Sequence, residues 1–356
     1  MRRVLHVGPA NSPGGMATVM RILVKNPPEG WNAQTIATHV DGSILAKLMV
    51  WRRSRRQIAQ LLADSTSRPD LVHIHSAADW SFHRKTVILG LCKKYNIPCV
   101  LHIHSGKFDS WLGKPGNGTA VKARRAITEA DAKVVVLTER WAEKLTPLLG
   151  DCQAIANPIE SFEDTASSTP PPTSPPNNSP REAGKLLLMG RPDPVKGASL
   201  AIAATRIMRN QGREVTLHLT GVAPGHKWSR IAEAEGLVVA HGWLPIEELE
   251  QLRAEAGLML VPSAWEGQPM VILEAMARGL PILGSPACAE HIAGAGRIVA
   301  EMNPEAWAQA ISTLLDDEGG RREMAEAGKE RTKLHLIEVV AEQWKTLYDD
   351  LINRLY

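Results

Sequence analysis

Short apolar segments alternate with helical stretches along most of the chain, and this alternation restricts the fold more than any other feature. Six segments lie in the first half: Arg3–Gly8, Gln34–Val40, Leu71–His75, Cys99–His104, Lys133–Thr138 and Gln153–Asn157. Six more lie in the second half: Lys185–Gly190, Thr216–Gly221, Leu237–Gly242, Leu258–Ser263, Pro281–Gly284 and Gly296–Ala300. Continuous apolar strands that alternate with helices form parallel sheets covered on both faces. The sequence therefore predicts an α/β protein with two Rossmann-like domains.

A Ser/Thr/Pro-rich tract separates the two sets of segments. Residues 161–183 read SFEDTASSTPPPTSPPNNSPREA, a composition that cannot pack a core, so we expect an exposed linker there. The 356 residues are enough for two domains of ordinary size, which we place at 1–160 and 184–335. Apolar residues recur at helical spacing over 336–356, which predicts a closing helix.

Charge is unevenly distributed between the two halves. Residues 1–160 hold 22 basic and 12 acidic residues, a net charge of +10, whereas residues 161–356 hold 19 and 26, a net charge of −7. No nucleic-acid-binding motif accompanies the basic half, so we expect no nucleic-acid partner. MRRVLHVG reads as a first strand rather than a signal peptide, and no apolar stretch is long enough to span a bilayer. Together with four scattered cysteines, this predicts a cytoplasmic protein.

The segment LMLVPSAWEGQPMVILEAMARGLPILGS places a strand, a tight glycine-containing turn and a helix in direct succession. Pro269 suits the first turn of that helix, expected over Met270–Arg278, which is apolar on every face except at Glu274. Free N–H groups at a helix N-terminus bind anions such as phosphate. A nucleoside diphosphate would use both features, with its ribose diol on Glu274 and its phosphates on the N–H groups. The alternative is that Glu274 pairs with a buried arginine.

Two motifs in the second half resemble those of a known family. Glu266 and Glu274, with seven residues between them, resemble the E-x7-E signature of the retaining GT-B glycosyltransferases of family 4 (glycosyl transferases group 1). The segment GRPDPVKG, from Gly190 to Gly197, resembles the family's G-R-x4-K-G loop, whose Arg and Lys hold the donor pyrophosphate. Two cations there would stabilise the charge that develops on a leaving nucleoside diphosphate. Taken alone, GRPDPVKG would more simply be a solvated turn.

Two loops in the first half fit the same family. Gly14 and Gly15 lie in a turn that lacks the spacing of a dinucleotide fingerprint and looks like the family's GG loop, which faces the cleft. An ordinary glycine-rich turn is the alternative. On the family match, His104 reaches the donor sugar, whereas His73 and His102 are buried structural residues. The H-x-H pairs His73/His75 and His102/His104 lack the further ligands of a zinc motif, so we expect no metal site.

One connection in the second half matches the family and another departs from it. HGWLP, around Trp243, is similar to the family's G-x-x-P connection near the nucleobase. Trp243 could line the base pocket, and simple packing is the safer interpretation. Where the family has a glycine-rich turn before a glutamate, this chain reads SPACAE over Ser285–Glu290, which puts the usual contacts of that loop in doubt.

The resemblance implies a GT-B fold, in which two parallel sheets face a central cleft and helix 336–356 crosses back to the N-terminal domain. A terminal helix of the second domain is the alternative for 336–356. The implied reaction moves a hexose from a nucleotide diphosphate sugar, UDP- or GDP-linked, to a glycan or lipid-linked acceptor, with retention and without a metal or a further cofactor. A silent nucleotide-sugar-binding subunit and a nucleotide-sugar epimerase are the competing interpretations.

The same resemblance assigns roles to individual residues. The catalytic set is His104, Glu266, Arg191 and Lys196. The donor-binding set is Glu274, Gly267, Gln268, Pro269, Met270, Gly190 and Trp243. The loop of Gly14 and Gly15 is implied to face the acceptor cleft.

A basic helix is expected over residues 44–62, ILAKLMVWRRSRRQIAQLL. It holds four arginines, at positions 52, 53, 55 and 56, among apolar residues. Such a segment can lie on an anionic bilayer, which would place the protein on the inner face of the membrane. The alternative is a solvated helix that covers the first sheet.

Overall fold

The computed structural model describes residues 1–160 and 181–354. The chain divides into two compact units, Met1–Glu160 with His335–Tyr356, and Ser161–Leu334. Residues 161–180 of the expected linker lie outside the described residues, and Glu182 already begins a strand of the second unit. The two units are described separately below.

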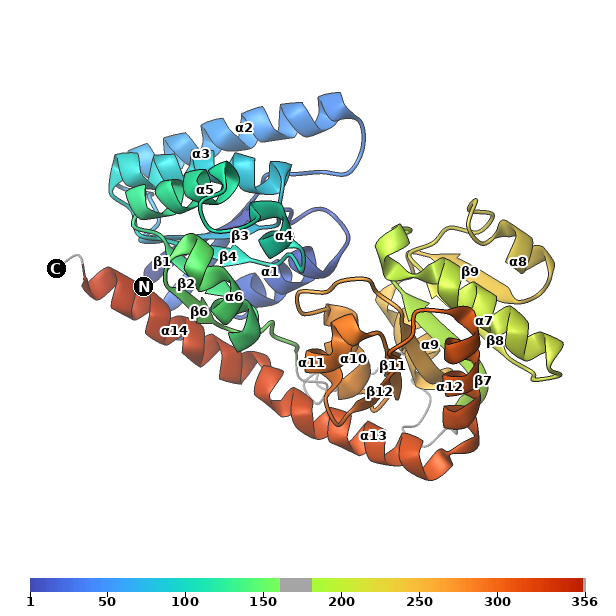
Figure 1. Ribbon diagram of the computed structural model, residues 1–356. Helices are drawn as coiled ribbons and strands as arrows, with labels where there is room; N and C mark the ends of the chain where they lie inside the picture. Colours follow the sequence, from blue (N-terminus) through green and yellow to red (C-terminus); the bar gives the residue numbers. More distant parts are fainter. Residues whose placement is uncertain (161–180, 355–356) are drawn as a thin grey trace. The chain divides into compact units, whose positions relative to one another are not determined.

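The first unit contains a six-stranded parallel sheet in the order β2-β1-β3-β4-β5-β6 (Figure 1). Its strands are β1 (Arg2–Gly8), β2 (Trp31–Ala37), β3 (Leu71–Ser76), β4 (Cys99–Ile103), β5 (Lys133–Val136) and β6 (Cys152–Ala154). Its helices are α1 (Gly15–Lys25), α2 (Ile44–Ala63), α3 (Trp80–Tyr95), α4 (Phe108–Leu112), α5 (Gly118–Glu129), α6 (Glu139–Leu149) and α14 (Ile337–Asn353). The second strand, β2, lies on one side of β1, and all later strands from β3 onward are added on the other side, so the strand order reverses between β1 and β3.

The second unit contains another six-stranded parallel sheet, in the order β12-β11-β10-β7-β8-β9. Its strands are β7 (Glu182–Met189), β8 (Thr216–Thr220), β9 (Val238–Gly242), β10 (Ala256–Val261), β11 (Ile282–Gly284) and β12 (Gly296–Ile298). Its helices are α7 (Ala198–Asn210), α8 (Arg230–Ala234), α9 (Ile246–Glu255), α10 (Met270–Ala277), α11 (Ala289–Ile292), α12 (Pro304–Asp316) and α13 (Glu318–Thr332). Three short 3-10 turns, Pro194–Lys196, Pro286–Cys288 and Lys333–His335, complete the described elements.

Because side chains alternate along a strand, the two faces of the sheet lie in different environments. On the first sheet, Leu5, Val72 and Leu101 join one buried core cluster with residues of α2, α3 and α5. The opposite face carries histidines and is covered by α14, whose Trp344 ring lies 4.5 Å from the His73 ring. The expected fold class, two Rossmann-like domains with parallel sheets, is therefore confirmed.

One expected strand is misplaced in the sequence interpretation. The second strand was expected over Gln34–Val40 and instead runs from Trp31 to Ala37. Trp31 is 2% exposed, pairs with Arg2 across the sheet and donates its indole N–H to Asp349 of α14 at 3.1 Å. Burial of this large aromatic side chain, together with its partner on α14, fixes the earlier start.

The closing helix belongs to the first unit. Arg2 forms an ion pair with Asp349 at 2.6 Å, and the Tyr348 hydroxyl lies 2.6 Å from Nδ1 of His73. No helix among the described residues is both long and apolar enough to pass through a bilayer.

Candidate functional site

In the second sheet, β7 and β10 are neighbours although β8 and β9 lie between them in the sequence. The direction in which successive strands are added to the sheet therefore reverses at this pair. In open parallel sheets, ligands bind at the carboxyl ends of the strands at such a reversal. The loop after β7 contains Gly190–Gly197, and the loop after β10 leads to α10. Both loops with family motifs therefore begin at this one point.

Direct contacts join the two loops. Nζ of Lys196 lies 2.7 Å from Oε1 of Glu266, and the backbone N–H of Ala264 donates to the carbonyl of Val195 at 2.9 Å. The Glu266 side chain is only 9% exposed and that of Lys196 is 26% exposed, so the ion pair is largely shielded from water. A lysine and a glutamate seventy positions apart in the sequence are thus brought into contact.

Gly197 makes the close approach of these loops feasible. Its φ is +68°, in the left-handed region, and a Cβ at this position would lie 2.3 Å from the carbonyl oxygen of Pro262. Any larger residue would have to push the β10 loop away. Gly190 also has a positive φ, +155°, and packs against the aliphatic part of Lys196.

We expect Gly197→Ala to lower the thermal unfolding midpoint clearly more than Gly212→Ala does. Both glycines are left-handed, which costs a non-glycine residue about 1–2 kcal/mol. Gly212 has φ +80° and no atom within 4 Å of an added Cβ, so it lacks the clash with Pro262. Differential scanning calorimetry of the two variants checks this, and equal midpoints would show that the loops are not held together through Gly197.

The first turn of α10 can receive an anion. The buried residues Gly267, Gln268 and Pro269 lead into Met270, the first residue of the helix. The N-cap residue Pro269 makes no side-chain hydrogen bond to this end of α10, and the N–H of Ile272 already donates to the Pro269 carbonyl at 3.1 Å, so the N–H groups before Ile272 are the ones that can receive an anion. The helix ends one residue earlier than expected, at Ala277.

Glu274 forms an ion pair with Arg253, a buried residue of α9 that is 3% exposed. Arg253 also contacts Glu250 at 2.7 Å, and Glu250 in turn pairs with Arg278. The pairing with a buried arginine, which the sequence left open as an alternative, is therefore present. Only Oε2 of Glu274 is engaged; Oε1 makes no hydrogen bond within the described part of the chain, and the side chain is 21% exposed. The pairing thus leaves one oxygen of Glu274 open to a ligand.

The remaining expected residues of the second unit are less enclosed. Arg191 is exposed on the loop after β7. Trp243 follows β9 and is 56% exposed, so the safer interpretation, simple packing, does not describe it.

Ser285, in the turn that departs from the family pattern, donates its hydroxyl to the carbonyl of Ser263 at 2.6 Å. This unusual turn is therefore hydrogen-bonded to the loop that carries Glu266.

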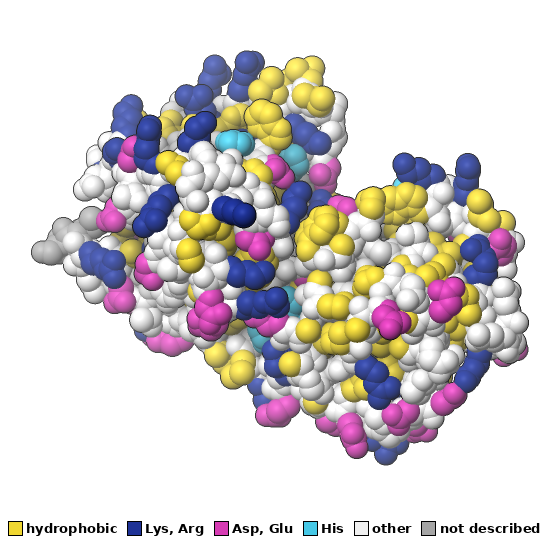
Figure 2. All heavy atoms as spheres, viewed as in Figure 1, with side chains coloured by type: hydrophobic (Ala, Val, Ile, Leu, Met, Phe, Trp, Pro, Cys, Tyr) yellow, Lys and Arg dark blue, Asp and Glu magenta, His cyan; other side chains and the backbone are white. Residues whose placement is uncertain are grey.

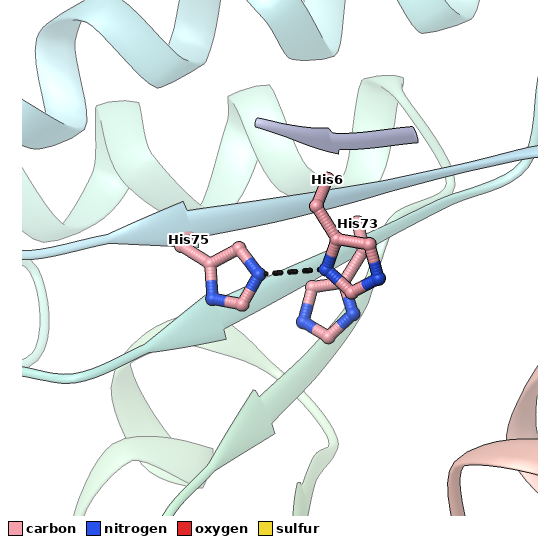
Figure 3. A group of neighbouring side chains, drawn as sticks. All are labelled: His6, His73 and His75. Atoms are coloured by element: carbon pink, nitrogen blue, oxygen red, sulfur yellow. Dashed lines mark hydrogen bonds between the residues drawn. The ribbon is translucent and has the colours of Figure 1, made fainter. Parts of the chain in front are cut away.

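In the first unit, five histidines gather on the sheet face covered by α14: His6, His73, His75, His102 and His104. Figure 3 shows His6, His73 and His75, whose rings come from β1 and β3 and lie against one another. Nδ1 of His6 lies 3.0 Å from Nε2 of His75, whose Nδ1 lies 3.0 Å from Nε2 of His104. Burial lowers the pKa of His6 and of His104 to about 3, so both are neutral at pH 7. His73 and His102 are fully buried, whereas His104 keeps part of its surface exposed.

Gly14 and Gly15 lie at the carboxyl end of β1, where α1 begins. Gly14 has φ +132° and is the residue before the helix, and Gly15 is its first residue. Their expected contact with an acceptor stays a prediction.

Comparison with known proteins gives a family match for the second unit. Residues 183–317 match the family model described as glycosyl transferases group 1. The second unit is thus similar to the group 1 glycosyltransferases over most of its length. The matched range contains both loops that meet through Lys196 and Glu266, as well as the Glu274–Arg253 pair.

Several known proteins are similar to this chain. Glycogen synthase of Mycobacterium tuberculosis is 26% identical over 298 residues, which are 78% of this chain and 68% of the relative. D-inositol 3-phosphate glycosyltransferase of Corynebacterium glutamicum is 30% identical over 178 residues, 46% of this chain and 43% of the relative. Among solved structures, sucrose-phosphate synthase from Thermosynechococcus elongatus superposes with a TM-score of 0.74 at 18% identity, covering 99% of this chain and 100% of that one. Anabaena HepE in complex with UDP and glucose superposes with a TM-score of 0.68 at 16% identity, covering 98% and 100%.

Sequence reasoning missed two residues of the clusters described above. Arg253 was not singled out, although a basic residue in the last turn of a helix that precedes a buried strand is a candidate partner for a buried acid. His6 was missed because it stands alone in its strand. The alternation of the first strand does place His6 on the face opposite Leu5 and Val7.

Proposed function

We propose that the protein transfers a sugar from a nucleotide diphosphate sugar to a glycan or lipid-linked acceptor, with retention of anomeric configuration and without a metal ion. The contact between Lys196 and Glu266 is the observation that carries this proposal, because it joins the two family loops at the sheet reversal of the second unit. A UDP- or GDP-linked donor is favoured, in line with the UDP and glucose bound to the structural relative HepE.

In the proposed mechanism, the protein stabilises the departing nucleoside diphosphate. Arg191 and Lys196 hold the pyrophosphate, and the backbone N–H groups of Gly267, Gln268 and Met270 around the start of α10 donate to phosphate or sugar oxygens. The free oxygen of Glu274 accepts a hydrogen bond from the ribose diol, and Glu266 contacts sugar hydroxyls. The departing phosphate assists deprotonation of the acceptor on the same face, so no covalent nucleophile is required. His104 reaches the sugar and Trp243 lines the base pocket, as in the family.

A thermal-shift panel of UDP, GDP and ADP sugars tests donor binding and identifies the base. A ligand present at 100 times its dissociation constant stabilises the fold by about 2.7 kcal/mol. Release of UDP or GDP from the stabilising donor distinguishes a transferase from a silent binding subunit, and the anomer of the product, read by NMR, distinguishes retention from inversion. Unchanged turnover in EDTA is expected; loss of turnover that Mg2+ or Mn2+ restores would refute the metal-independent mechanism.

We further propose that α2 brings the first unit to an anionic membrane. Ile44, Leu45, Leu48 and Met49 are 41–86% exposed at the start of the helix, and exposed arginines follow directly at 52, 53, 55 and 56. Figure 2 shows hydrophobic and basic side chains next to each other along the edge formed by α2. Only Ser54, Ile58 and Leu62 of this helix are buried, so its first half offers apolar side chains beside positive charge, as bilayer-surface helices do.

Replacement of the four arginines of α2 by glutamine should abolish salt-sensitive co-sedimentation with anionic liposomes, because each Arg near the surface contributes about 1 kcal/mol. The matched control replaces Lys122, Arg124 and Arg125, exposed basic residues of α5, and should still bind. Binding of the α2 variant at the level of the wild type would leave α2 as a solvated helix and favour a soluble acceptor.

A further inference from the structure

The histidine cluster of the first unit contains a set of three ring nitrogens that can converge on one point. His75, His102 and His104 each offer one nitrogen, and these atoms all lie within 4.8 Å of one another. His75 and His102 are directly paired across β3 and β4, and His104 lies two positions beyond His102. Side chains at directly paired positions, and at positions two apart, share a sheet face, so the backbone places the three rings together.

One ring nitrogen of His102 lacks a partner. Nε2 of His102 is buried and has no hydrogen-bond partner within residues 1–160 and 181–354. A buried polar atom without a partner costs free energy unless a bound group satisfies it. The unpartnered nitrogen belongs to the ring that lies closest to His104, with ring centroids 4.0 Å apart.

In two of these rings, His75 and His102, one nitrogen already lies within hydrogen-bonding distance of a neighbouring histidine. Nε2 of His75 lies 3.0 Å from Nδ1 of His6, and Nδ1 of His102 lies 3.1 Å from Nε2 of His73. Nδ1 of His73 in turn lies 2.6 Å from the Tyr348 hydroxyl. When the N–H of His75 donates to His6 and the N–H of His102 donates to His73, the lone pairs of His75 Nδ1 and His102 Nε2 are left for another ligand. Histidines that bind metals almost always donate their other N–H to a hydrogen-bond acceptor, and here the ring nitrogens of His6 and His73 accept.

We propose that His75, His102 and His104 bind one divalent transition metal ion of the zinc class. Three neutral imidazoles suit Zn2+, Co2+, Ni2+ or Cu2+, whereas Mg2+ and Ca2+ require oxygen ligands, which this set does not offer. Nδ1 of His75 and Nε2 of His104, now 3.0 Å apart, would each turn a lone pair to the ion, and the proton between them moves to Nδ1 of His104. The exposed part of His104 leaves a side open for water as a fourth ligand.

The overlapping trio His6, His73 and His75 is less suitable, although its nitrogens also lie within 4.8 Å of one another. Both ring nitrogens of His73 are engaged, one by Tyr348 and one by His102. All three residues are fully buried, so an ion there would have no water ligand. His6 and His73 therefore act as the outer partners of the site.

The second unit provides a matched comparison. His218 of β8 and His241 of β9 form a similar pair on adjacent strands, with Nδ1 and Nε2 2.9 Å apart. No third histidine, cysteine or carboxylate completes a ligand set around this pair within the described residues. Loss of His241 should therefore leave metal binding unchanged.

Titration of the full chain with Co2+ and Zn2+ tests the site. We expect one Co2+ per chain with the intense visible absorption of a tetrahedral ion, displaced by one equivalent of Zn2+. His104→Ala, at the partly exposed position, should lose the absorption and the stoichiometric Zn2+, whereas His241→Gln keeps both. His6→Phe should retain the site with about tenfold to a hundredfold weaker Zn2+ binding.

The proposal would be overturned if the wild type shows no tetrahedral Co2+ absorption. It would also be overturned if His104→Ala keeps this absorption while it unfolds at the same midpoint as the wild type. A second variant, His102→Gln, serves if His104→Ala fails to fold. These readouts do not depend on sugar transfer. On the proposed function, where His104 contacts the sugar, Zn2+ would inhibit transfer and chelation would restore it, so the ion is an inhibitor rather than a cofactor.

Discussion

Lys196→Ala should reduce the turnover number of the proposed sugar transfer by about 10²–10³-fold, the usual effect of removing one preorganised donor from developing charge. The donor dissociation constant should change much less. The physical reason is that the diphosphate becomes more negative as the glycosidic bond breaks, so the cation binds the transition state more strongly than the bound donor. Arg191→Ala should change turnover in the same direction.

The ion pair with Glu266 sharpens this expectation. Glu266 is 9% exposed, and removal of Lys196 leaves it with an unpaired, largely buried carboxylate at the sugar site. The effects of Lys196→Ala and Glu266→Gln on turnover should therefore be non-additive in a double-mutant cycle, because each substitution removes one partner of the same ion pair. Lys185 is the matched control: it is also ion-paired, with Glu255 at 2.8 Å, but it lies in β7, upstream of the loop. Steady-state kinetics in which Lys185→Ala and Lys196→Ala reduce turnover equally would contradict a specific role for Lys196.

Much of this arrangement could be predicted from the sequence, because its information is local. A parallel strand buried on both faces is a continuous apolar run, and the glycines and proline around 190–197 and 262–269 mark the loops directly. The rule that ligands bind at carboxyl ends of strands then places both loops at one sheet edge. The contact between Lys196 and Glu266 follows from these features together with the motif resemblance.

The partners of Glu274 and of the histidines could not be derived in the same way. Arg253 approaches Glu274 because α9 and α10 lie on the same side of their sheet, and nothing in either helix encodes that pairing. The order of β1, β3 and β4 brings His6 to His73 and His75 to His102; another strand order would separate them. Strand order depends on the whole fold, so side-chain contacts that depend on it were missed or left as alternatives.

Glu274→Ala should show two separable losses, one in stability and one in donor binding. Removal of one partner from a buried ion pair typically costs 3–5 kcal/mol, and because Arg253 retains Glu250, we expect the lower end, about 3 kcal/mol. Loss of the acceptor for the ribose diol should also weaken nucleotide binding about tenfold to a hundredfold, since a hydrogen bond to a charged group contributes about 1.5–3 kcal/mol.

Glu250→Ala separates these two losses. Glu250 contacts Arg253 and Arg278 but lies outside the proposed donor site, so its removal should lower the unfolding midpoint and leave nucleotide affinity unchanged. In the double variant Arg253→Met/Glu274→Ala, the buried cation that had lost one of its two carboxylate partners is gone, and stability should recover while nucleotide binding does not.

Calorimetric unfolding and titration with the donor's nucleoside diphosphate, carried out on the same variants, distinguish the two roles of Glu274. If Glu274→Ala loses stability but its folded fraction binds nucleotide as the wild type does, the residue serves only the ion network. A loss of binding that persists in the stabilised double variant requires a direct contact with the nucleotide. The carboxylate would then have both roles, with Oε2 held by Arg253 so that Oε1 is fixed in place for the ribose.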